Sequence, residues 1–164
     1  MQVSDNNFKY AIRQGTLDDL HDLVVATSHA HKDSPYRNLD GELDIADSIE
    51  FISSLLAGDQ SVGCVFIATH DNSLVGLIMC TMMPYNRSLH DKVVAGEPLW
   101  WVHPDHRGGT LGLRLLKQYE TWATDSGYHL VQTGALDDRT GKLLERLGYT
   151  EIGRTYMKEL SNGS

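Results

Sequence analysis

The sequence has no long apolar run and little cysteine, and each absence excludes a class of protein. No run approaches the roughly 20 apolar residues that a membrane-spanning helix needs. The first ten residues, MQVSDNNFKY, lack the basic and apolar regions of a secretory signal. The two cysteines, Cys64 and Cys80, lie in separate apolar segments, which favours buried thiols over a disulfide or a zinc site. We therefore expect a cytoplasmic protein that binds no metal and does not associate with membranes.

An excess of basic charge is also lacking. The chain has 14 Lys and Arg residues against 22 Asp and Glu residues, which gives a formal net charge of -8. Neither nucleic acid nor an acidic membrane surface attracts such an anion, so we do not expect nucleic acid as a partner. No internal repeat, low-complexity tract or linker interrupts the sequence. We therefore expect a single domain over residues 1–164.

Apolar periodicity and chain-breaking residues predict strands that alternate with helices. Strands are expected over residues 9–13, 63–69, 74–81, 92–103, 129–133 and 149–158. Helices are expected over residues 16–28, 44–58, 110–125 and 138–147. Gly96 and Pro98 indicate a bulge or irregularity inside the strand over 92–103. This order predicts an α/β fold, a mixed sheet with helices on its faces.

The segment WWVHPDHRGGTLGLRLL, residues 100–116, joins an expected strand to the longest expected helix. Gly108 and Gly109 permit a tight turn, and the first N–H groups of the following helix lack intrahelical partners. Such a turn receives phosphate oxygens, and Arg107 and Arg114 add positive charge. A glycine-rich turn without a ligand is the alternative, because glycines alone are a weak signal. The segment has neither the Gly-Lys-Ser/Thr of a P-loop nor the spacing of a dinucleotide fingerprint.

The order of elements and the segment VHPDHRGGTLGLRLL together resemble the GNAT-type N-acetyltransferase superfamily. In that family a strand ending in V-x-P precedes a turn that binds the pyrophosphate of acetyl-CoA. A later helix ends in a segment similar to LLERLGY, residues 143–149. The resemblance covers nearly the whole chain and implies a central mixed β-sheet of about six to seven strands, flanked by four helices. The HRGG turn and the His/Ser-Pro-Tyr loop look like those of a phage-encoded subset of the family.

The resemblance also implies that acetyl-CoA, the co-substrate, lies along the strand and the turn. A backbone N–H near Val102 would polarise the thioester carbonyl. One of Trp100 and Trp101 is expected in the core, the other at the cleft or at a dimer contact. The residues implied in cofactor binding are Trp101, Val102, Arg107, Gly108, Gly109, Thr110, Leu111, Gly112 and Leu144.

Two of these residues depart from the family pattern. Thr110 stands where the family usually has glycine, and its N–H still permits an anion site. Leu144 stands where many members have a tyrosine that protonates the leaving thiolate. Either another group supplies that proton, or the thiolate leaves unassisted, as a thiol pKa of about 8.5 allows. Tyr149 and Tyr156 are candidate substitutes, but we expect both to pack in the core.

Glu97 and His103 are the candidate catalytic residues. Glu97 is expected on the same strand as Val102, where family members often have a catalytic glutamate. A partly apolar cleft would raise the pKa of its carboxyl group towards neutrality, which suits a general base. His103 titrates in a useful pH range. A solvent-exposed glutamate and a structural histidine are the two alternatives.

The resemblance places the acceptor site in the segment between the first two helices. His31 and Tyr36, within HAHKDSPYRNLDGE, are the candidate substrate contacts, and a polar surface loop is the alternative. The expected reaction transfers an acetyl group to a primary amine of a small molecule or protein by direct attack in a ternary complex. The alternatives are a catalytically silent CoA-binding or interaction domain and an enzyme that acetylates a nucleic-acid-linked amine. The family also makes a homodimer a reasonable expectation.

Overall fold

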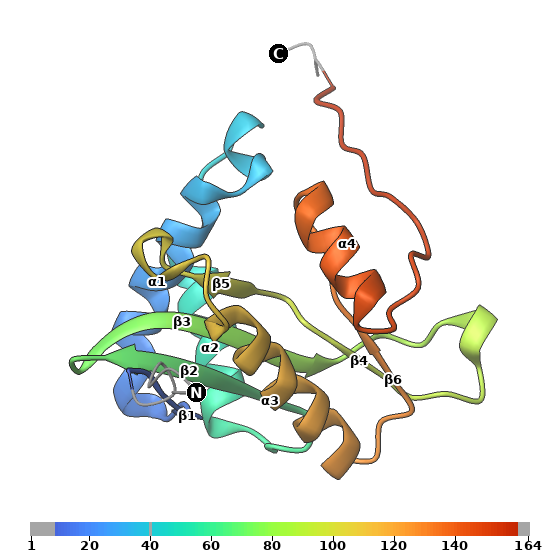
Figure 1. Cartoon of the computed structure of the whole chain (residues 1–164), viewed down its shortest axis with the longest axis horizontal. Coiled ribbons are helices and arrows are strands. Elements are labelled where there is room, and N and C mark those ends of the chain that lie inside the picture. The colour runs from blue at the N-terminus through green and yellow to red at the C-terminus, as the bar shows by residue number, and fades with distance from the viewer. Residues whose placement is uncertain (1–8, 40, 161–164) are drawn as a thin grey trace, which may run out of the picture.

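The computed structural model describes residues 9–39 and 41–160, which form an α/β fold around a mixed sheet (Figure 1). Within these residues the sheet has six strands, and four α-helices accompany it, as the family resemblance implies. The strands are β1 (Ala11–Gln14), β2 (Gly63–His70), β3 (Ser73–Met82), β4 (Val94–Gly96), β5 (Trp100–Val102) and β6 (Leu130–Gln132). The α-helices are α1 (Leu20–Asp33), α2 (Ile45–Ala57), α3 (Leu111–Asp125) and α4 (Asp138–Arg146). Short 3-10 helices are η1 (Leu17–Asp19), η2 (Pro35–Asn38), η3 (Arg87–Leu89) and η4 (Pro104–His106).

The sheet is antiparallel except for one pair of strands. β1, β2 and β3 pair antiparallel in that order, and β3 pairs antiparallel with both β4 and β5. β6 pairs parallel with β4. Asp71 and Asn72 close the β2–β3 hairpin with φ angles of 49° and 61°, as a two-residue hairpin turn requires. β4 and β6 separate after Gly96 and Gln132, which leaves β5 and β6 apart at the carboxyl ends of the parallel strands.

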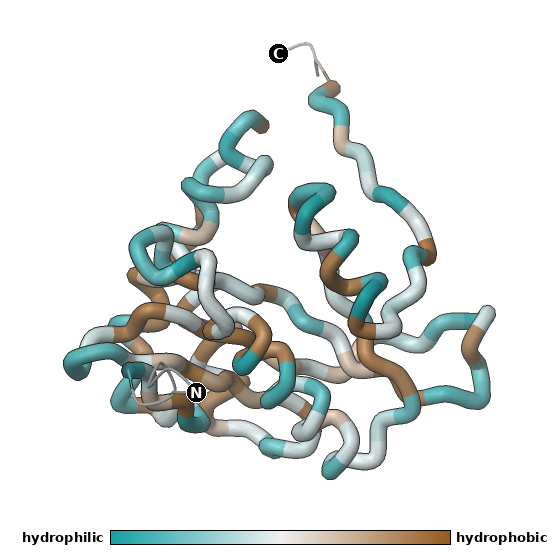
Figure 2. The backbone as a smooth tube through the Cα atoms, viewed as in Figure 1, coloured by the Kyte–Doolittle hydropathy of each residue, from teal (hydrophilic) through white to brown (hydrophobic). Residues whose placement is uncertain are grey.

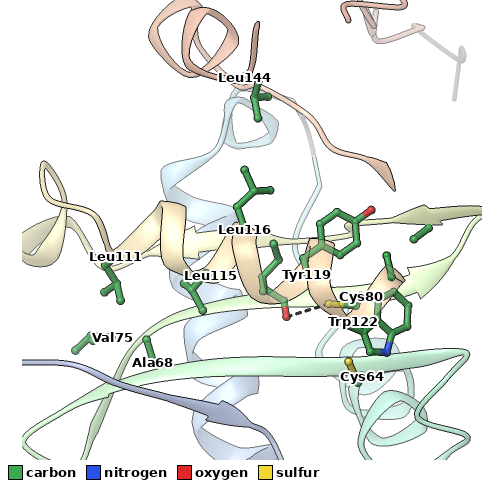
Figure 3. Close-up of a cluster of buried hydrophobic side chains, with 13 residues drawn as sticks. Cys64, Ala68, Val75, Cys80, Leu111, Leu115, Leu116, Tyr119, Trp122 and Leu144 are labelled. Atoms are coloured by element: carbon green, nitrogen blue, oxygen red, sulfur yellow. Dashed lines mark hydrogen bonds between the residues drawn. The ribbon is translucent and has the colours of Figure 1, made fainter. Parts of the chain in front are cut away.

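Helices cover both faces of the sheet, because β2 and β3 are apolar on both sides. Figure 2 shows the apolar residues gathered along these central strands. α1 and α2 pack on odd-numbered strand residues, including Val65, Ile67, Leu77 and Met79. α3 packs on the opposite face, against Cys64, Ala68, Ile78 and Cys80 (Figure 3). Among the described helices, none is long and apolar enough to cross a membrane.

The bounds of the first helix differ from the expectation. α1 continues to Asp33, whereas the sequence predicts an end near Ser28. Ala26 and Ala30 are buried and carry the apolar face of the helix into the segment expected to be a loop. Pro35 disfavours helical backbone at the residue before it, so the helix ends only there.

The expected strand over residues 92–103 is present as two short strands with a bulge between them. Thr81 pairs with Gly96, whereas Ile78 pairs with Trp100. Three steps along β3 therefore match four steps along its partner, so one extra residue is inserted. The predicted irregularity is confirmed, and it lies next to Glu97. Bulges redirect side chains, which matters for the site described below.

The expected final strand over residues 149–158 is wrong. Tyr149 packs against the hydrophobic cluster that α3 forms with the sheet. Residues 151–160, however, have no regular secondary structure and are exposed. Tyr156, expected in the core, is 85% exposed. A strand needs a neighbour with which to pair its backbone, and no described strand of this chain lies beside residues 151–160.

Candidate active site

An open pocket lies at the turn between η4 and α3. Its volume is about 290 Å³. A Cβ atom added at Gly108 or Gly109 would meet no other atom within 4 Å, so the glycines leave space free for a ligand. Gly108 has a φ of 89°, a backbone conformation that favours glycine. The pocket is lined by Lys9, Tyr10, Asp105, His106, Arg107, Gly108, Gly109, Thr110 and Leu111.

The start of α3 offers hydrogen-bond donors to this pocket. Arg114 is the first residue whose N–H bonds back to the turn, to the carbonyl oxygen of Thr110 at 2.9 Å. The N–H groups of Leu111, Gly112 and Leu113 therefore have no intrahelical acceptor, and the helix dipole adds partial positive charge. Donors and open space at one place suit phosphate oxygens, so the residues present fit a pyrophosphate.

Arg107 does not point freely into this pocket. Its Nε donates to the carbonyl oxygen of Val102 at 2.7 Å, and its Nη2 donates to Asp33 Oδ2 at 3.1 Å. The Asp33 carboxylate also accepts from Trp101 Nε1 at 3.1 Å. This Trp101 hydrogen bond, followed by the charge of Arg107, holds the pKa of Asp33 below its usual range. Arg107 thus joins the turn to the C-terminal end of α1.

β5 has one uncovered edge, and Val102 faces it. His103 N–H donates to the Val75 carbonyl oxygen of β3 at 2.8 Å. Neighbouring residues of a strand direct their backbone groups to opposite sides, so those of Val102 point away from β3. The Arg107 bond to the Val102 carbonyl lies on that side. No described strand pairs with this edge, so the N–H of Val102 has no strand partner there.

Glu97 lies where the parallel strands β4 and β6 separate. It follows β4 directly, as Thr133 and Gly134 follow β6. Its Oε2 accepts from Thr133 Oγ1 at 2.7 Å, and its carboxylate also accepts from the backbone N–H of Gly134. Burial raises the pKa of Glu97 to about 7, against the opposing effect of these two bonds. Such a carboxyl group can take up or release a proton near neutral pH, as a general base must.

His103 caps η4 with its side chain. Its Nδ1 accepts from the Asp105 N–H at 3.2 Å, and its ring lies 5.9 Å from that of Trp101 between centroids. If Nδ1 accepts this bond, the neutral ring carries its proton on Nε2 and has no free lone pair. The contacts therefore support the structural interpretation of His103, and its catalytic role stays a prediction.

Leu144 of α4 is buried in the hydrophobic cluster that α3 forms with the sheet. It is 6% exposed and lies above Leu116 (Figure 3). The nearby Tyr149 hydroxyl donates to Glu120 Oε1 at 2.9 Å. Burial and this Glu120 bond raise the pKa of Tyr149, so its hydroxyl is a poor proton donor. Neither residue offers a proton to a leaving thiolate.

The candidate substrate contacts lie at the far end of α1. His31 is half-buried in the last turn of the helix, and Tyr36, on η2, is 49% exposed. The ring of His29 stacks on Trp101 with 6.4 Å between centroids. Trp101 is buried on the α1–α2 face, as expected of one member of the pair, and Trp100 is partly buried against the α3 cluster; its position at a cleft or a dimer contact stays a prediction. Contact of His31, Tyr36 or Trp101 with a ligand stays a prediction.

Three residues of the site carry contacts that sequence reasoning missed. Asp33 fixes Arg107, Thr133 bonds Glu97, and the Tyr10 hydroxyl lies 3.0 Å from His106 Nδ1 beside the turn pocket. Thr133 alone had a usable signal, because it follows the end of a strand that runs parallel to its neighbour. The sequence around Asp33 and Tyr10 gives no sign of the residues that these two side chains contact in the fold.

Comparison with known proteins identifies a matching family model and similar folds. A model of the acetyltransferase (GNAT) family matches residues 18–149. That range includes the turn pocket's glycines, Glu97 and Leu144. No curated protein matches the sequence.

Several solved structures share the fold at low sequence identity. An aminoglycoside N-acetyltransferase, AAC(6')-Iy, in complex with CoA is 19% identical, with a TM-score of 0.68 and coverage of 93% of this chain and 95% of that one. An aminoglycoside acetyltransferase from an uncultured soil metagenomic sample, in complex with sisomicin, is 17% identical, with a TM-score of 0.69 and coverage of 94% and 99%. A ribosomal-protein-alanine N-acetyltransferase from Brucella melitensis is 17% identical, with a TM-score of 0.63 and coverage of 93% and 99%.

Proposed function

The chain belongs to the acetyltransferase (GNAT) family, and from this premise we propose that it transfers an acetyl group from acetyl-CoA to a primary amine by direct attack in a ternary complex. The observation that carries the proposal is the position of Glu97. Its carboxyl group, with a pKa raised to about 7, lies where β4 and β6 separate, in the bulge that joins β4 to β5. A base, an open backbone donor and an anion-binding turn follow one another along residues 97–112.

The turn pocket and β5 supply the binding of acetyl-CoA. The N–H groups at the start of α3 hold the pyrophosphate, and Gly108 and Gly109 let it approach the backbone. The Val102 N–H, on the free edge of β5, donates to the thioester carbonyl and stabilises the negative charge that develops there. Acetyl-CoA supplies the thioester that the amine attacks.

Glu97 accepts the proton that the amine nitrogen loses as it attacks, directly or through one water molecule. A carbon–nitrogen bond forms, the carbon–sulfur bond breaks, and CoA leaves as a thiolate that takes a proton from solvent. This route needs no acid at position 144, since a thiol with a pKa of about 8.5 is an adequate leaving group. The packing of Leu144 and the bond of Tyr149 to Glu120 support it.

The acceptor lies on the side of α1 and η2 in this proposal, near His31 and Tyr36. The structural neighbours include enzymes named for aminoglycosides and for a protein alanine, which supports amines of either kind as acceptors.

The test combines binding with turnover. Calorimetry is expected to show acetyl-CoA binding, and a thiol-release assay is expected to show CoA formation that depends on an added amine. Glu97→Gln is expected to bind acetyl-CoA normally but to lower kcat/KM by roughly 10²-fold or more, since general bases contribute about that much. The wild-type rate should fall below pH of about 7, where Glu97 becomes protonated, and Glu97→Gln should lose this acidic limb.

Glu145→Gln is the matched control, because Glu145 is an exposed carboxylate on α4. It should keep both the rate and the acidic limb. Binding of acetyl-CoA without amine-dependent thiol release, across a panel of small amines and peptides, would overturn the transferase proposal in favour of a silent CoA-binding domain. An unaltered pH profile in Glu97→Gln would remove Glu97 from the mechanism.

A further inference from the structure

The turn pocket between η4 and α3 is bordered by basic side chains, although the chain as a whole carries a formal net charge of -8. Lys9, His106 and Arg107 all line it, and Asp105 is the one carboxylate among the described lining residues. Arg107 is already paired with Asp33. No ion pair of Lys9 or His106 is found among the described residues. These two basic groups of the lining are therefore left for a bound anion.

Three histidine rings meet beside the pocket. The ring centroid of His106 lies 5.3 Å from that of His70 and 5.7 Å from that of His103. Loss of contact with water, followed by the positive charge of His70 and of Lys9, holds the pKa of His106 below its ordinary value of 6.5. The ring of His106 is therefore mostly neutral in the free protein at a pH of about 7. A negative ligand in the pocket would offset the neighbouring positive charge and favour the protonated ring.

Hydrogen bonds restrict two of the three rings. His103 Nδ1 accepts from the Asp105 N–H at 3.2 Å, and a proton on this nitrogen would break that bond. His70 Nδ1 lies 3.0 Å from the Lys9 carbonyl oxygen, which can only accept, so this nitrogen already carries a proton. His70 Nε2 lies 3.3 Å from Asp71 Oδ2, so a second proton on His70 would serve Asp71. Neither ring is free to gain a proton for a ligand.

His106 has no such restriction. Its Nδ1 lies 3.0 Å from the Tyr10 hydroxyl, which can donate to a neutral ring and accept from a charged one. In the part of the chain that the structure describes, no residue bonds its Nε2. His106 can therefore gain a proton and keep its contact with Tyr10, while Nε2–H is left for a ligand in the pocket that His106 lines.

We propose that His106 is a further binding residue of the turn pocket, which takes a proton from solvent as the phosphate groups of acetyl-CoA bind and then pairs with them. In the charged ring Nδ1–H donates to the Tyr10 hydroxyl and Nε2–H donates to a phosphate oxygen. Such a bond from a charged donor is stronger than one between neutral groups. The inference rests on the proposed function, because it takes acetyl-CoA as the ligand of this pocket.

Calorimetry of acetyl-CoA binding in two buffers with different heats of ionisation counts the protons taken up. We expect uptake at a pH of about 7 in the wild-type protein and clearly less in His106→Gln, because glutamine can still bond Tyr10 but takes up no proton. The ligand is the same in both titrations, so the difference belongs to the protein. His90→Gln, at an exposed histidine that ends η3, is the matched control and should keep the wild-type uptake.

The pH dependence of affinity gives a second measurement. A bound anion raises the pKa of the ring, so the gain in affinity is complete below the pKa of the free protein and is lost as pH rises through the pKa of the complex. Wild type should bind acetyl-CoA at least about threefold more tightly than His106→Gln at a pH of about 6, and about equally at a pH of about 8. His106→Lys, which stays charged, should keep its advantage over His106→Gln at both values.

The outcomes separate this inference from the proposed function. If acetyl-CoA failed to bind the wild-type protein, both would be overturned. Binding with equal proton uptake in wild type and His106→Gln would overturn the role of His106 and leave the transferase proposal intact. The role would also be excluded if His90→Gln lost the uptake to the same extent, or if the advantage of His106→Lys disappeared at the higher pH.

Discussion

The carboxyl group of Glu97 owes its properties to two features of the backbone around it. The bulge between β4 and β5 takes Glu97 out of the ladder with β3, and β6 ends beside it at Gln132. The carboxylate accepts hydrogen bonds from Thr133 and Gly134, and burial raises its pKa to about 7. A group held in this way lowers the stability of the fold when it is ionised.

Stability should therefore depend on pH through Glu97. Its pKa is 4.5 when unperturbed and about 7 in the folded protein. Between these values the folded state holds a proton that the unfolded state has lost, so the contribution of Glu97 to the unfolding free energy falls as pH rises through this range. The total fall is about 3 kcal/mol at 1.36 kcal/mol per pKa unit. Urea unfolding from pH 4 to 8 should show this decline in wild type and Glu145→Gln but not in Glu97→Gln. If the unfolding free energy changed with pH equally in all three proteins, the raised pKa assigned to Glu97 would be contradicted.

Substitution of Gly109 tests whether the pocket at the turn between η4 and α3 binds the pyrophosphate. Because a Cβ at this position meets nothing within 4 Å, Gly109→Glu should fold normally while it repels phosphate and fills the pocket. We expect acetyl-CoA affinity to fall at least 100-fold by calorimetry. Gly109→Gln has nearly the same size without the charge and should lose distinctly less. If both variants bind as wild type does, the pyrophosphate lies elsewhere.

At the scale of elements, α4 is held to the core by a single buried side chain. Leu144 is its one buried residue, and it packs against Leu116 of α3. The other residues of α4 face solvent or lie partly buried at its edge. Leu144 therefore serves as the apolar attachment of this helix to the core.

Leu144→Ala should destabilise the protein by about 2–3 kcal/mol, at the lower end for a buried leucine because the helix can settle into the space. Hydrogen exchange should accelerate most in the amides of α4, while α1 and α2 keep their protection. Leu147→Ala, three residues later and 47% exposed, is the control and should cost less than about 1 kcal/mol. Uniform acceleration across the protein would contradict a local role for Leu144.

The boundaries of the helices and strands show which features local sequence signals can predict. The hairpin, α2, α3 and α4 follow from local signals: Asp44 caps α2 by accepting from the Asp47 N–H, and Gly148 ends α4 with a φ of 93°. α1 is longer than expected, because burial of Ala30 depends on packing that no local pattern contains. The final strand fails for a related reason, since a strand exists only where an edge receives it.

For the whole molecule, the order of elements and the segment VHPDHRGGTLGLRLL together resemble the family, and the family model confirms this resemblance. The bulge was predictable from Gly96 and Pro98, and with it the position of Glu97. The contacts of Asp33 with Arg107 and of Thr133 with Glu97 were not, because they join residues 74 and 36 positions apart. Such contacts follow from how helices and strands meet in space, which composition and periodicity do not encode.

The Arg107 bridge has a consequence for how two ligands share this protein. Its guanidinium touches both the strand that would receive acetyl-CoA and, through Asp33, the helix beside the expected acceptor site. A ligand that draws Arg107 away from Asp33 alters the charge at the end of α1, and a cation that engages Asp33 releases Arg107. Thermodynamic reciprocity then requires each ligand to change the affinity for the other by the same factor.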